Sequence, residues 1–421
     1  MANHCTSALI SHLLTVHWPT DIPDFSNLFI QDNMTKYSAR TALKSYSEEL
    51  DYTAERNSEP ISRSQSLIYY IEGNKWWIKV TLRGPTANLP LNNAGEQQTT
   101  KRERREFFQS FVRRIDYKFL PLLPHTVTEV ILGDATATGP EVELKLDDAS
   151  GTLQNPTTAL RCNIQEDFRS VAYPSCDEFP SFRQINHKEL TGATEITAGV
   201  FWVYHRKTRY VLKMVDRPLY RRHDTEVIRK ELENLNYFAG VPNIVQAAGI
   251  AVSTNPYKTF DWDTGLPLVV TGILLEAYPG GTLQQVLSDR RVTEYRWKEW
   301  PIQIGTALNR FHEAKKTHMD LEPSNIVLDA DGNAVLIDIS GFTREWCTSE
   351  VRNTISPCDL PFEQRQQNDI WAYGKLLSEI ASQISDDAYV ETLRQVADRL
   401  MERDHQKRMS IAMAIAQLQS A

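Results

Sequence analysis

Residues 317–341 read THMDLEPSNIVLDADGNAVLIDISG, and this stretch places chemically useful side chains at short, regular spacings. Asn325 follows Asp320 by five residues, and Asp338 follows Asn325 by thirteen. Each of these residues taken alone would more often be a turn or capping residue. Together they supply two oxygen ligands suited to a hard metal ion and one further carboxylate that can accept a proton.

Two apolar runs within this stretch predict a β-hairpin. Residues 326–328 and 334–337 are apolar, and the segment 329–332 between them has the composition of a turn. A hairpin would bring Asn325 and Asp338 to neighbouring strand ends. We therefore expect their side chains to converge on one site.

The same residues resemble motifs of the eukaryotic-type protein kinase family. HMDLEPSN, residues 318–325, resembles the family's H-R-D-L-x-x-x-N loop, and DISG, residues 338–341, resembles its D-F-G motif. Five further segments resemble family motifs in the expected order, so the similarity covers about residues 190–421. They are RYVLKMV with Lys213, RKELENL with Glu231, ILLEAYPGGTL with Leu275 as gatekeeper, NDIWAYG with Asp369 and Trp371, and MERDHQKRMS with Arg408. The segments are also similar to kinase-like proteins of filamentous fungi.

The resemblance implies a fold of the α+β class. A two-lobed protein kinase-like domain, with a small β-rich N-lobe and a helical C-lobe, is expected over residues 186–421. A separate mixed α/β region of unknown function is expected over residues 1–185, with linker segments from about residue 147, where small and turn-forming residues become frequent. The cofactors that the resemblance implies are ATP and Mg²⁺, because phosphoryl transfer depends on positioning and charge neutralisation.

The resemblance also implies roles for individual residues. Lys213 would hold the α- and β-phosphates and pair with Glu231, while Asp320 would accept or orient the proton of the substrate hydroxyl. Asn325 and Asp338 would bind Mg²⁺. The remaining positions are Val200, Val211 and Val327 around the adenine slot, the backbone of Glu276, Ala277 and Tyr278 opposite the base, and a structural spine of Leu235, His318 and Ile339 anchored at Asp369.

Three features depart from the family pattern. The phosphate-covering loop LTGATEITAGVFWV, residues 190–203, lacks the GxGxxG spacing and has Ala198 near the last glycine position. Met319 replaces an arginine that in many relatives grips an activation-loop phosphate, so control by phosphorylation there is not expected. Glu322 replaces a lysine that stabilises the transferring phosphate. At about 4 Å and an effective dielectric near 20 a charge pair is worth roughly 4 kcal/mol, so this exchange predicts weak activity.

The activation segment and the substrate platform are expected to be short. Glu350 in TREWCTSEVR would stand at the glutamate of the family's A-P-E motif and pair with Arg408. The alternative is Glu363 in LPFEQR, which leaves only six residues before Asp369, and we favour Glu350 for that reason. The short distance between the NDIWAYG and MERDHQKRMS motifs leaves little room for the helix that many relatives use to dock substrates.

The first part of the chain predicts strands and one helix. Residues 101–117, KRERREFFQSFVRRIDY, place Phe107, Phe111 and Ile115 at helical spacing beneath a basic face. This helix could bind an anion or a partner, but we favour an ordinary surface helix whose Lys and Arg side chains are solvated. The expected strands are a hairpin of 66–71 and 76–82 around Gly73-Asn74, then 127–132, then the alternating residues Val142, Leu144 and Leu146.

Composition and charge narrow the expected location and partners. Of 421 residues, 41% are hydrophobic and 24% are charged, and the formal net charge of −8 gives no global attraction to nucleic acids or anionic membranes. The sequence has no long apolar run and no recognisable signal peptide, and its five scattered cysteines favour reduced thiols. We expect a cytoplasmic or alternatively nuclear protein, without nucleic-acid or membrane partners.

The sequence retains the reactive residues of the family, which are Lys213, Glu231, Asp320, Asn325 and Asp338. Their retention favours an ATP-dependent kinase with weak or atypical activity towards Ser/Thr hydroxyls of a protein substrate. Two alternatives stay open. One is a pseudokinase that acts as a nucleotide-binding or protein-interaction scaffold, and the other is a small-molecule phosphotransferase on the same fold. The N-terminal region is expected to bind a partner or to regulate the second half.

Overall fold

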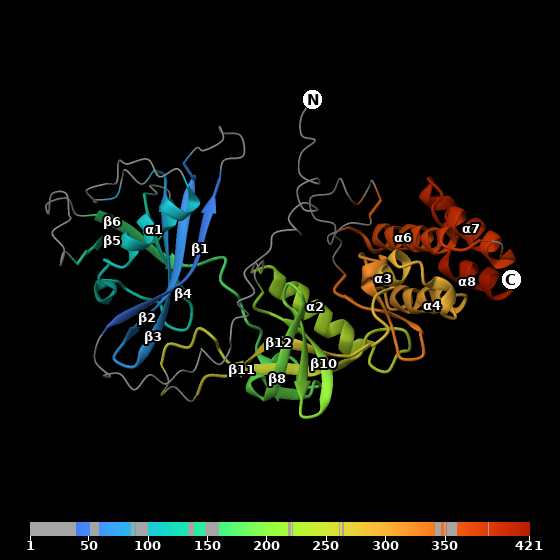
Figure 1. The fold of residues 1–421 in the computed structure, drawn as a ribbon, viewed down its shortest axis with the longest axis horizontal. Coiled ribbons are helices and arrows are strands. Elements are labelled where there is room, and N and C mark those ends of the chain that lie inside the picture. Colours follow the sequence, from blue (N-terminus) through green and yellow to red (C-terminus); the bar gives the residue numbers. More distant parts are fainter. Residues whose placement is uncertain are drawn as a thin grey trace.

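The computed structural model describes most of the chain as two six-stranded sheets followed by a helical region, in chain order (Figure 1). The described residues are 39–50, 59–85, 89, 100–133, 139–147, 160–217, 220, 222–260, 262, 265–341, 347–348, 351, 360–385 and 387–421. Within these ranges, no helix has the length and apolar character needed to cross a bilayer.

The first sheet is mixed and has the strand order β1-β2-β3-β4-β6-β5. Its strands β3 and β4 are parallel, so the chain must cross over between them, and helix α1 lies in that crossover. The elements are β1 (Arg40–Glu49), β2 (Ser62–Ile71), β3 (Asn74–Arg83), α1 (Lys101–Val112), β4 (Val127–Leu132), β5 (Glu141–Leu144) and β6 (Leu160–Glu166).

The hairpin prediction in this sheet is confirmed. Strands β2 and β3 pair antiparallel from Ser62↔Arg83 to Ile71↔Asn74. The connecting turn consists of Glu72 and Gly73, both with positive φ values of 52° and 80°, as a two-residue hairpin turn requires. The turn therefore lies one residue earlier than the predicted Gly73-Asn74.

Helix α1 packs its apolar side against this sheet, as predicted. Phe107, Phe108 and Phe111 are buried in the first core. Thr100 starts the helix with a capping box, in which its hydroxyl accepts from the backbone N–H of Glu103. The helix ends at Val112, so the predicted element of 101–117 is shortened by a turn that precedes Ile115.

The second sheet has the strand order β7-β11-β12-β10-β9-β8 and packs against helix α2. Residues Ile228, Leu232 and Leu235 of α2 are buried in a core that continues into the helical region. The elements are β7 (Gln184–Asn186), β8 (Leu190–Thr197), β9 (Val200–His205), β10 (Thr208–Met214), α2 (Asp224–Tyr237), β11 (Ala247–Thr254) and β12 (Leu268–Glu276).

The helical region completes the predicted α+β, two-lobed architecture, which is confirmed. Between α6 and α7, the described residues 383–385 and 387 contain no helix, in line with the expected lack of a docking helix. The elements are α3 (Leu283–Ser288), α4 (Glu299–Glu313), β13 (Ile326–Leu328), β14 (Ala334–Leu336), α6 (Phe362–Ser382), α7 (Ala388–Leu400) and α8 (Ile411–Gln419). Short 3₁₀ turns are η4 (Tyr117–Phe119), η5 (Cys176–Glu178), η6 (His187–Glu189), η7 (Val292–Glu294), η8 (Pro323–Asn325) and η10 (His405–Lys407).

The segment between the two sheets is not a loose connection where the structure describes it. Part of the expected linker zone lies outside the described residues, but Leu160 already begins strand β6, which the sequence did not predict. Cys176 and Phe179 are buried in the core of the second sheet. The domain boundary near residue 185 stays a prediction, and this packing favours a boundary further upstream.

The β11–β12 connection joins the second sheet to the first. Thr259 is 2% exposed, its carbonyl accepts from the backbone N–H of Lys75 at 3.0 Å, and its hydroxyl accepts from the backbone N–H of His125 at 2.9 Å. The neighbouring rings of Phe260 and Trp76 meet edge to face, with centroids 5.7 Å apart. The tip of this connection is therefore packed against the hairpin β2–β3 (Figure 1).

Candidate active site

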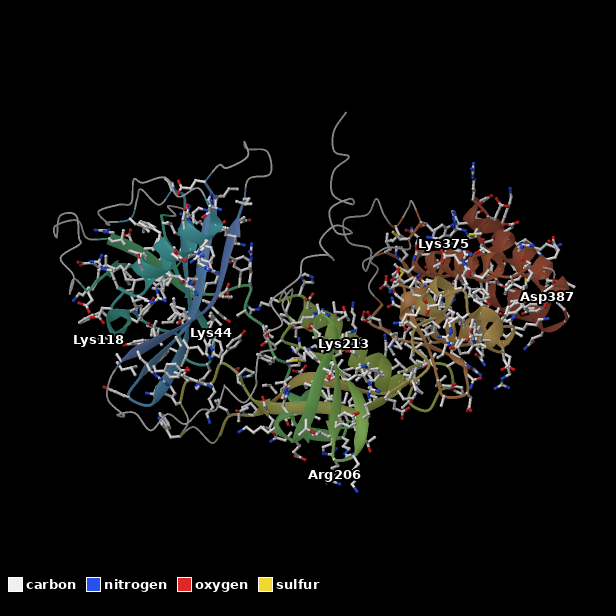
Figure 2. All side chains as sticks on the ribbon, viewed as in Figure 1. Lys44, Lys118, Arg206, Lys213, Lys375 and Asp387 are labelled. Carbon is white, nitrogen blue, oxygen red and sulfur yellow. The ribbon has the colours of Figure 1, made fainter. Side chains whose placement is uncertain are left out.

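Lys213 lies at the centre of the predicted site, on strand β10 of the second sheet (Figure 2). Its Nζ is 2.6 Å from Glu231 Oε2 on α2 and 2.5 Å from Asp338 Oδ1 after β14. The exposed fractions of the three side chains are 12% for Lys213, 1% for Glu231 and 24% for Asp338. The structure thus brings together three residues that lie 18 and 125 positions apart in the sequence.

The two carboxylates keep Lys213 charged. Burial opposes the charged form, but Asp338 and Glu231 outweigh burial and raise the pKa of Lys213. Burial raises the pKa of Glu231, against the opposing effect of Lys213. Among the described residues, the second oxygen of Glu231, Oε1, has no hydrogen-bond partner. The two ion pairs therefore fix a charged ammonium group between two carboxylates.

Strand register shows which neighbouring side chains share the face of Lys213. Val200 pairs with Lys213, whereas Val211 pairs with Trp202 on one side and Leu275 on the other. Cross-strand partners in an antiparallel sheet lie on the same face, and alternate residues of one strand share a face. Trp202 therefore lies beside Val211 on the face of the sheet that carries Lys213. Sequence reasoning missed this residue, although the alternation within residues 200–204 could have indicated it.

The hinge segment after β12 is tied to the hairpin β13–β14. Gly280 N–H donates to Leu328 O at 2.9 Å, and Leu328 N–H donates back to Gly281 O at 2.9 Å. A Cβ on Gly280 would lie 2.6 Å from the Cβ of Leu328, so only glycine allows this approach. Val327 is consequently held next to the hinge, where it bridges to Thr282.

The backbone of the expected base-binding segment is partly engaged within the protein. Glu276 N–H donates to Gln246 O at 3.0 Å, so that group is not available to a base. The hydroxyl of Tyr278 accepts from the backbone N–H of Gln246 at 3.1 Å, and burial raises the pKa of Tyr278 to about 12. Of the three predicted residues, Ala277 and Tyr278 keep backbone N–H groups that could meet a base.

Asp320 and Asn325 are directly linked on the loop before β13. Asn325 Nδ2 donates to Asp320 Oδ2 at 2.9 Å and to Asp320 O at 2.8 Å. Asp320 is only 3% exposed. This arrangement orients the carboxylate and leaves a substrate little access to it in the described conformation.

Asp369 anchors the loop that carries Asp320, as expected for the structural spine. Its carboxylate accepts from the backbone N–H of His318 at 2.8 Å and of Met319 at 2.7 Å. His312 contacts the same carboxylate at 3.0 Å. Met319 has a positive φ of 65°, so these two hydrogen bonds stabilise a conformation that a non-glycine residue rarely adopts.

The spine residues are buried and connected to the neighbourhood of Asp338. Leu235, His318 and Ile339 are all fully or nearly fully buried. Asn234 Nδ2 donates to Ile339 O at 2.6 Å, which ties helix α2 to the residue after Asp338. The replacement of the usual phenylalanine by Ile339 therefore leaves this packing intact.

The side-chain oxygens of Asn325 and Asp338 suit a Mg²⁺ ion that phosphate oxygens would also bind. Ile337 N–H donates to Asn325 O at 3.0 Å, so Asn325 is adjacent to the residue that precedes Asp338. No cluster of three or more His, Cys, Asp or Glu side chains able to hold a metal occurs in the described part of the chain. Mg²⁺ in phosphate sites needs only one or two protein ligands, because waters and phosphate oxygens supply the others. One carboxylate and one amide oxygen meet that requirement.

Glu322 lies on the same loop as Asp320, as the sequence predicts. It is half-buried, its carbonyl accepts from Asn325 N–H at 2.9 Å, and its carboxylate accepts a short hydrogen bond from the hydroxyl of Ser324. The structure thus holds the carboxylate of Glu322 on the loop that carries Asp320 and Asn325.

Met319 packs into a small apolar cluster instead of binding a phosphate. It is fully buried with Cys347 and Val351, and Leu360 packs against the group. The arginine of the family pattern is therefore replaced by apolar contacts that fix two points of the segment between Asp338 and α6. Glu350 lies outside the described residues. The alternative, Glu363, is in the first turn of α6, which begins earlier than the predicted NDIWAYG motif.

Helix α2 is braced by the segment that precedes the second sheet. The carbonyl of Ala172 accepts from the hydroxyl of Thr225 at 2.7 Å and from that of Tyr220 at 3.2 Å. Val270 N–H donates to Pro174 O at 2.8 Å, which fixes the same segment to β12. The start of the helix that carries Glu231 is thus anchored from outside the family-like motifs.

Comparisons with known proteins agree with this geometry. Residues 196–385 match the family described as protein kinase domain. The serine/threonine-protein kinase nekl-2 of Caenorhabditis elegans is 27% identical over 129 residues, which are 26% of this chain and 36% of that protein. The human hormonally up-regulated neu tumor-associated kinase is 26% identical over 133 residues, which are 31% of this chain and 16% of that protein. The chain therefore spans well under two thirds of the length of these relatives.

Proposed function

We infer that the second half of this chain, which contains a domain of the eukaryotic-type protein kinase-like family, transfers the γ-phosphate of Mg-ATP to Ser or Thr hydroxyls of a protein substrate. The position of Lys213 between Glu231 and Asp338, at 2.6 and 2.5 Å, carries this proposal. A protein kinase domain requires ATP and a divalent metal ion. This arrangement places the ammonium group of Lys213 beside Asp338, a carboxylate able to bind that metal.

Each polar side chain of the site has a separate proposed task. Lys213 neutralises charge on the α- and β-phosphates, and Asn325 and Asp338 hold the metal ion, for which we propose Mg²⁺. When bound, Mg²⁺ neutralises further phosphate charge and orients the transferred group. Asp320, oriented by the amide of Asn325 at 2.9 Å, accepts or orients the proton of the substrate hydroxyl.

The adenine base would lie between the sheet and the hairpin β13–β14. Val200, Val211 and Val327 are half-buried, as expected of side chains that line a slot with one open side. Trp202 lies beside Val211, and the guanidinium of Arg209 is 3.7 Å from its ring centroid. We propose that this stacked pair covers the outer part of the nucleotide and compensates in part for the missing glycines.

Two observations support weak or atypical turnover. Glu322 places a carboxylate where the family's lysine would stabilise the transferring phosphate, and Asp320 is only 3% exposed. These features favour, as a second candidate, a pseudokinase that binds nucleotide and acts as a scaffold. The two candidates share the nucleotide site and differ only in transfer.

Thermal unfolding with and without nucleotide tests the shared site. A ligand at a hundredfold its dissociation constant should stabilise the protein by about 2.7 kcal/mol. We expect an ATP shift that depends on Mg²⁺ and that is lost in Lys213→Ala and Asp338→Asn. An equal shift in all three proteins would contradict the proposed site.

Phosphate incorporation into a generic protein substrate or into the chain itself separates the two candidates. The wild type should incorporate phosphate, and Asp320→Asn should keep the thermal shift but lose incorporation. Equal incorporation in Asp320→Asn would exclude the kinase mechanism. A full Mg-ATP shift with no incorporation by the wild type would establish the scaffold.

A further inference from the structure

A basic hollow lies on the first sheet, between strand β1 and helix α1. Lys44, which lines it, is far from Lys213 (Figure 2). Its volume is about 400 Å³, within the size range of small-molecule sites. Four of its six lining side chains are cationic. The six residues are Lys44, Tyr46, Lys101, Arg102, Arg105 and Gln109.

Three of these cations form no salt bridge in the part of the chain that the structure describes, although Lys101 lies close enough to Glu48 to help lower the pKa of that carboxyl. Arg102 pairs with Glu106 at 2.8 Å on the exposed side of the helix. Lys44, Lys101 and Arg105 form no ion pair with any described residue. The chain as a whole has a net charge of −8, opposite in sign to this group.

The other polar groups near the hollow already have partners. Glu48 accepts two hydrogen bonds from Arg104, at 2.8 and 2.7 Å, and one from Tyr46 at 2.7 Å. Gln109 donates to Gln65 at 2.9 Å. The helix thus uses Arg104 for internal structure and presents Lys101 and Arg105 to the hollow.

The start of α1 is an unfavourable place for these cations, although Glu103 in the same turn and the nearby Glu48 and Glu106 offset part of the cost. Lys101 and Arg102 occupy the first turn of α1, where the helix dipole favours anions and disfavours cations. Lys44 adds a third like charge from the neighbouring strand, and like charges that share a small volume repel. Sequence features that oppose local stability often mark sites of function.

We propose that this hollow binds a compact anion that carries several phosphate groups. Guanidinium groups bind phosphate oxygens in a bidentate manner, and lysines add flexible ammonium groups. A multiply charged ligand would neutralise Lys44, Lys101 and Arg105 together and would also meet the positive end of the helix dipole. This site is independent of the proposed kinase site and gives the N-terminal region a ligand class. It revises our expectation that the basic face of this helix is only solvated.

Binding of inositol hexakisphosphate to the full-length chain, measured by calorimetry at physiological salt, tests the proposal. We expect saturable binding that weakens by at least about tenfold in the double variant Lys44→Glu/Arg105→Glu, because two contacts become repulsive. The matched control is Lys118→Glu/Lys145→Glu, which changes the charge equally at Phe119, where both lysines lie over the ring. The control should bind like the wild type.

Three results would overturn the proposal. The first is no saturable binding at millimolar probe, and the second is equal weakening in both double variants, which would reflect net charge alone. The third is displacement of the probe by a short RNA or an acidic phosphopeptide at much lower concentration, which would assign the hollow to a macromolecule. Thermal unfolding of each variant without ligand shows that it folds, and Lys44→Ala provides a milder substitution.

Discussion

Glu178 and Arg229 form a two-point ion pair, in which the guanidinium donates to the carboxylate at 2.9 and 3.2 Å. Glu178 belongs to the turn η5 before the second sheet, and Arg229 lies on α2, two residues before Glu231. The hydrogen bonds from Arg229 lower the pKa of Glu178, so the carboxylate is charged at neutral pH. The segment upstream of the kinase-like motifs thus holds the helix that positions the partner of Lys213.

Breaking this pair should loosen α2 without unfolding the protein. The two side chains are 36% and 39% exposed, and such pairs contribute about 1 kcal/mol or less to global stability. We expect Glu178→Ala to increase amide hydrogen exchange in α2 and to weaken Mg-ATP binding a few-fold. Glu313→Ala, which breaks an exposed pair with Arg310 on α4, is the matched control. Unchanged exchange in α2 would show that the pair does not brace it.

Replacing Glu322 should reveal how much its charge limits transfer. Glu322→Lys exchanges repulsion for attraction near the transferring phosphate, so we expect incorporation to rise at least about tenfold, which corresponds to 1.4 kcal/mol. Glu322→Gln removes the charge and should give an intermediate rate. If lysine and glutamine variants both match the wild type, charge at this position is not the limitation.

The apolar cluster around Met319 should fix the segment that follows Asp338. Met319→Arg would place a charged side chain in a fully buried position beside Cys347 and Val351. We expect lower stability, by about 2 kcal/mol or more, and faster proteolysis between Asp338 and α6. Met319→Leu, which keeps the apolar contact, should behave like the wild type, and equal proteolysis of both variants would refute a role for the cluster.

Acid should weaken the first sheet. Burial alone would raise the pKa of Glu129, but Lys79 at 2.9 Å and the hydroxyl of Thr81 at 2.7 Å outweigh it, so the pKa of Glu129 is lowered. A carboxylate with a lowered folded-state pKa contributes stability above its ordinary value of 4.5, and this contribution disappears as the pH falls through the lowered value. Unfolding followed from pH 7 to about 3 should therefore show a loss that is smaller in Glu129→Gln. The exposed Glu141→Gln should keep the full loss.

The contact between the two sheets should depend on the half-buried ring of Phe260 at the tip of the β11–β12 connection. Phe260 meets Trp76 at 5.7 Å and His125 at 5.5 Å. Phe260→Ala should separate calorimetric unfolding into two transitions and increase the radius of gyration in solution scattering. Trp262 is largely exposed and stacks on Phe260, so Trp262→Ala should have a smaller effect. A single sharp transition in both variants would mean that the sheets are coupled elsewhere.

The sequence was sufficient to predict features that depend on neighbouring residues or on the order of motifs along the chain. The hairpin β2–β3 follows from turn residues, and the placement of Lys213 with Glu231 was expected from motifs in family order. Trp202 was missed because its proximity to Val211 depends on cross-strand register, which motif matching does not read. Strand β6 was missed because its residues follow a segment of linker-like composition.

The features that the sequence did not predict depend on packing between segments that are distant in the chain. The motif showed that Met319 replaces an arginine, but the apolar cluster around it joins residues from two separate segments, so its members could not be predicted from local sequence. The basic hollow depends on Lys44, which is distant in sequence from Arg105 and is brought beside it by the pairing of β1 with β2. Such relationships become visible only when the fold is complete.

The packing of Thr259 and Phe260 against the first sheet also bears on how this chain can evolve. A loop that connects two strands usually tolerates insertions and sequence changes. The β11–β12 loop packs against the first sheet, so fewer changes can be accepted there. We expect substitutions at Phe260 and Trp76 to occur together among descendants of this gene. A kinase domain acquired by recombination would lack this tip and leave the rings of Trp76 and Trp77 uncovered. The two halves of the chain should therefore be inherited as one unit.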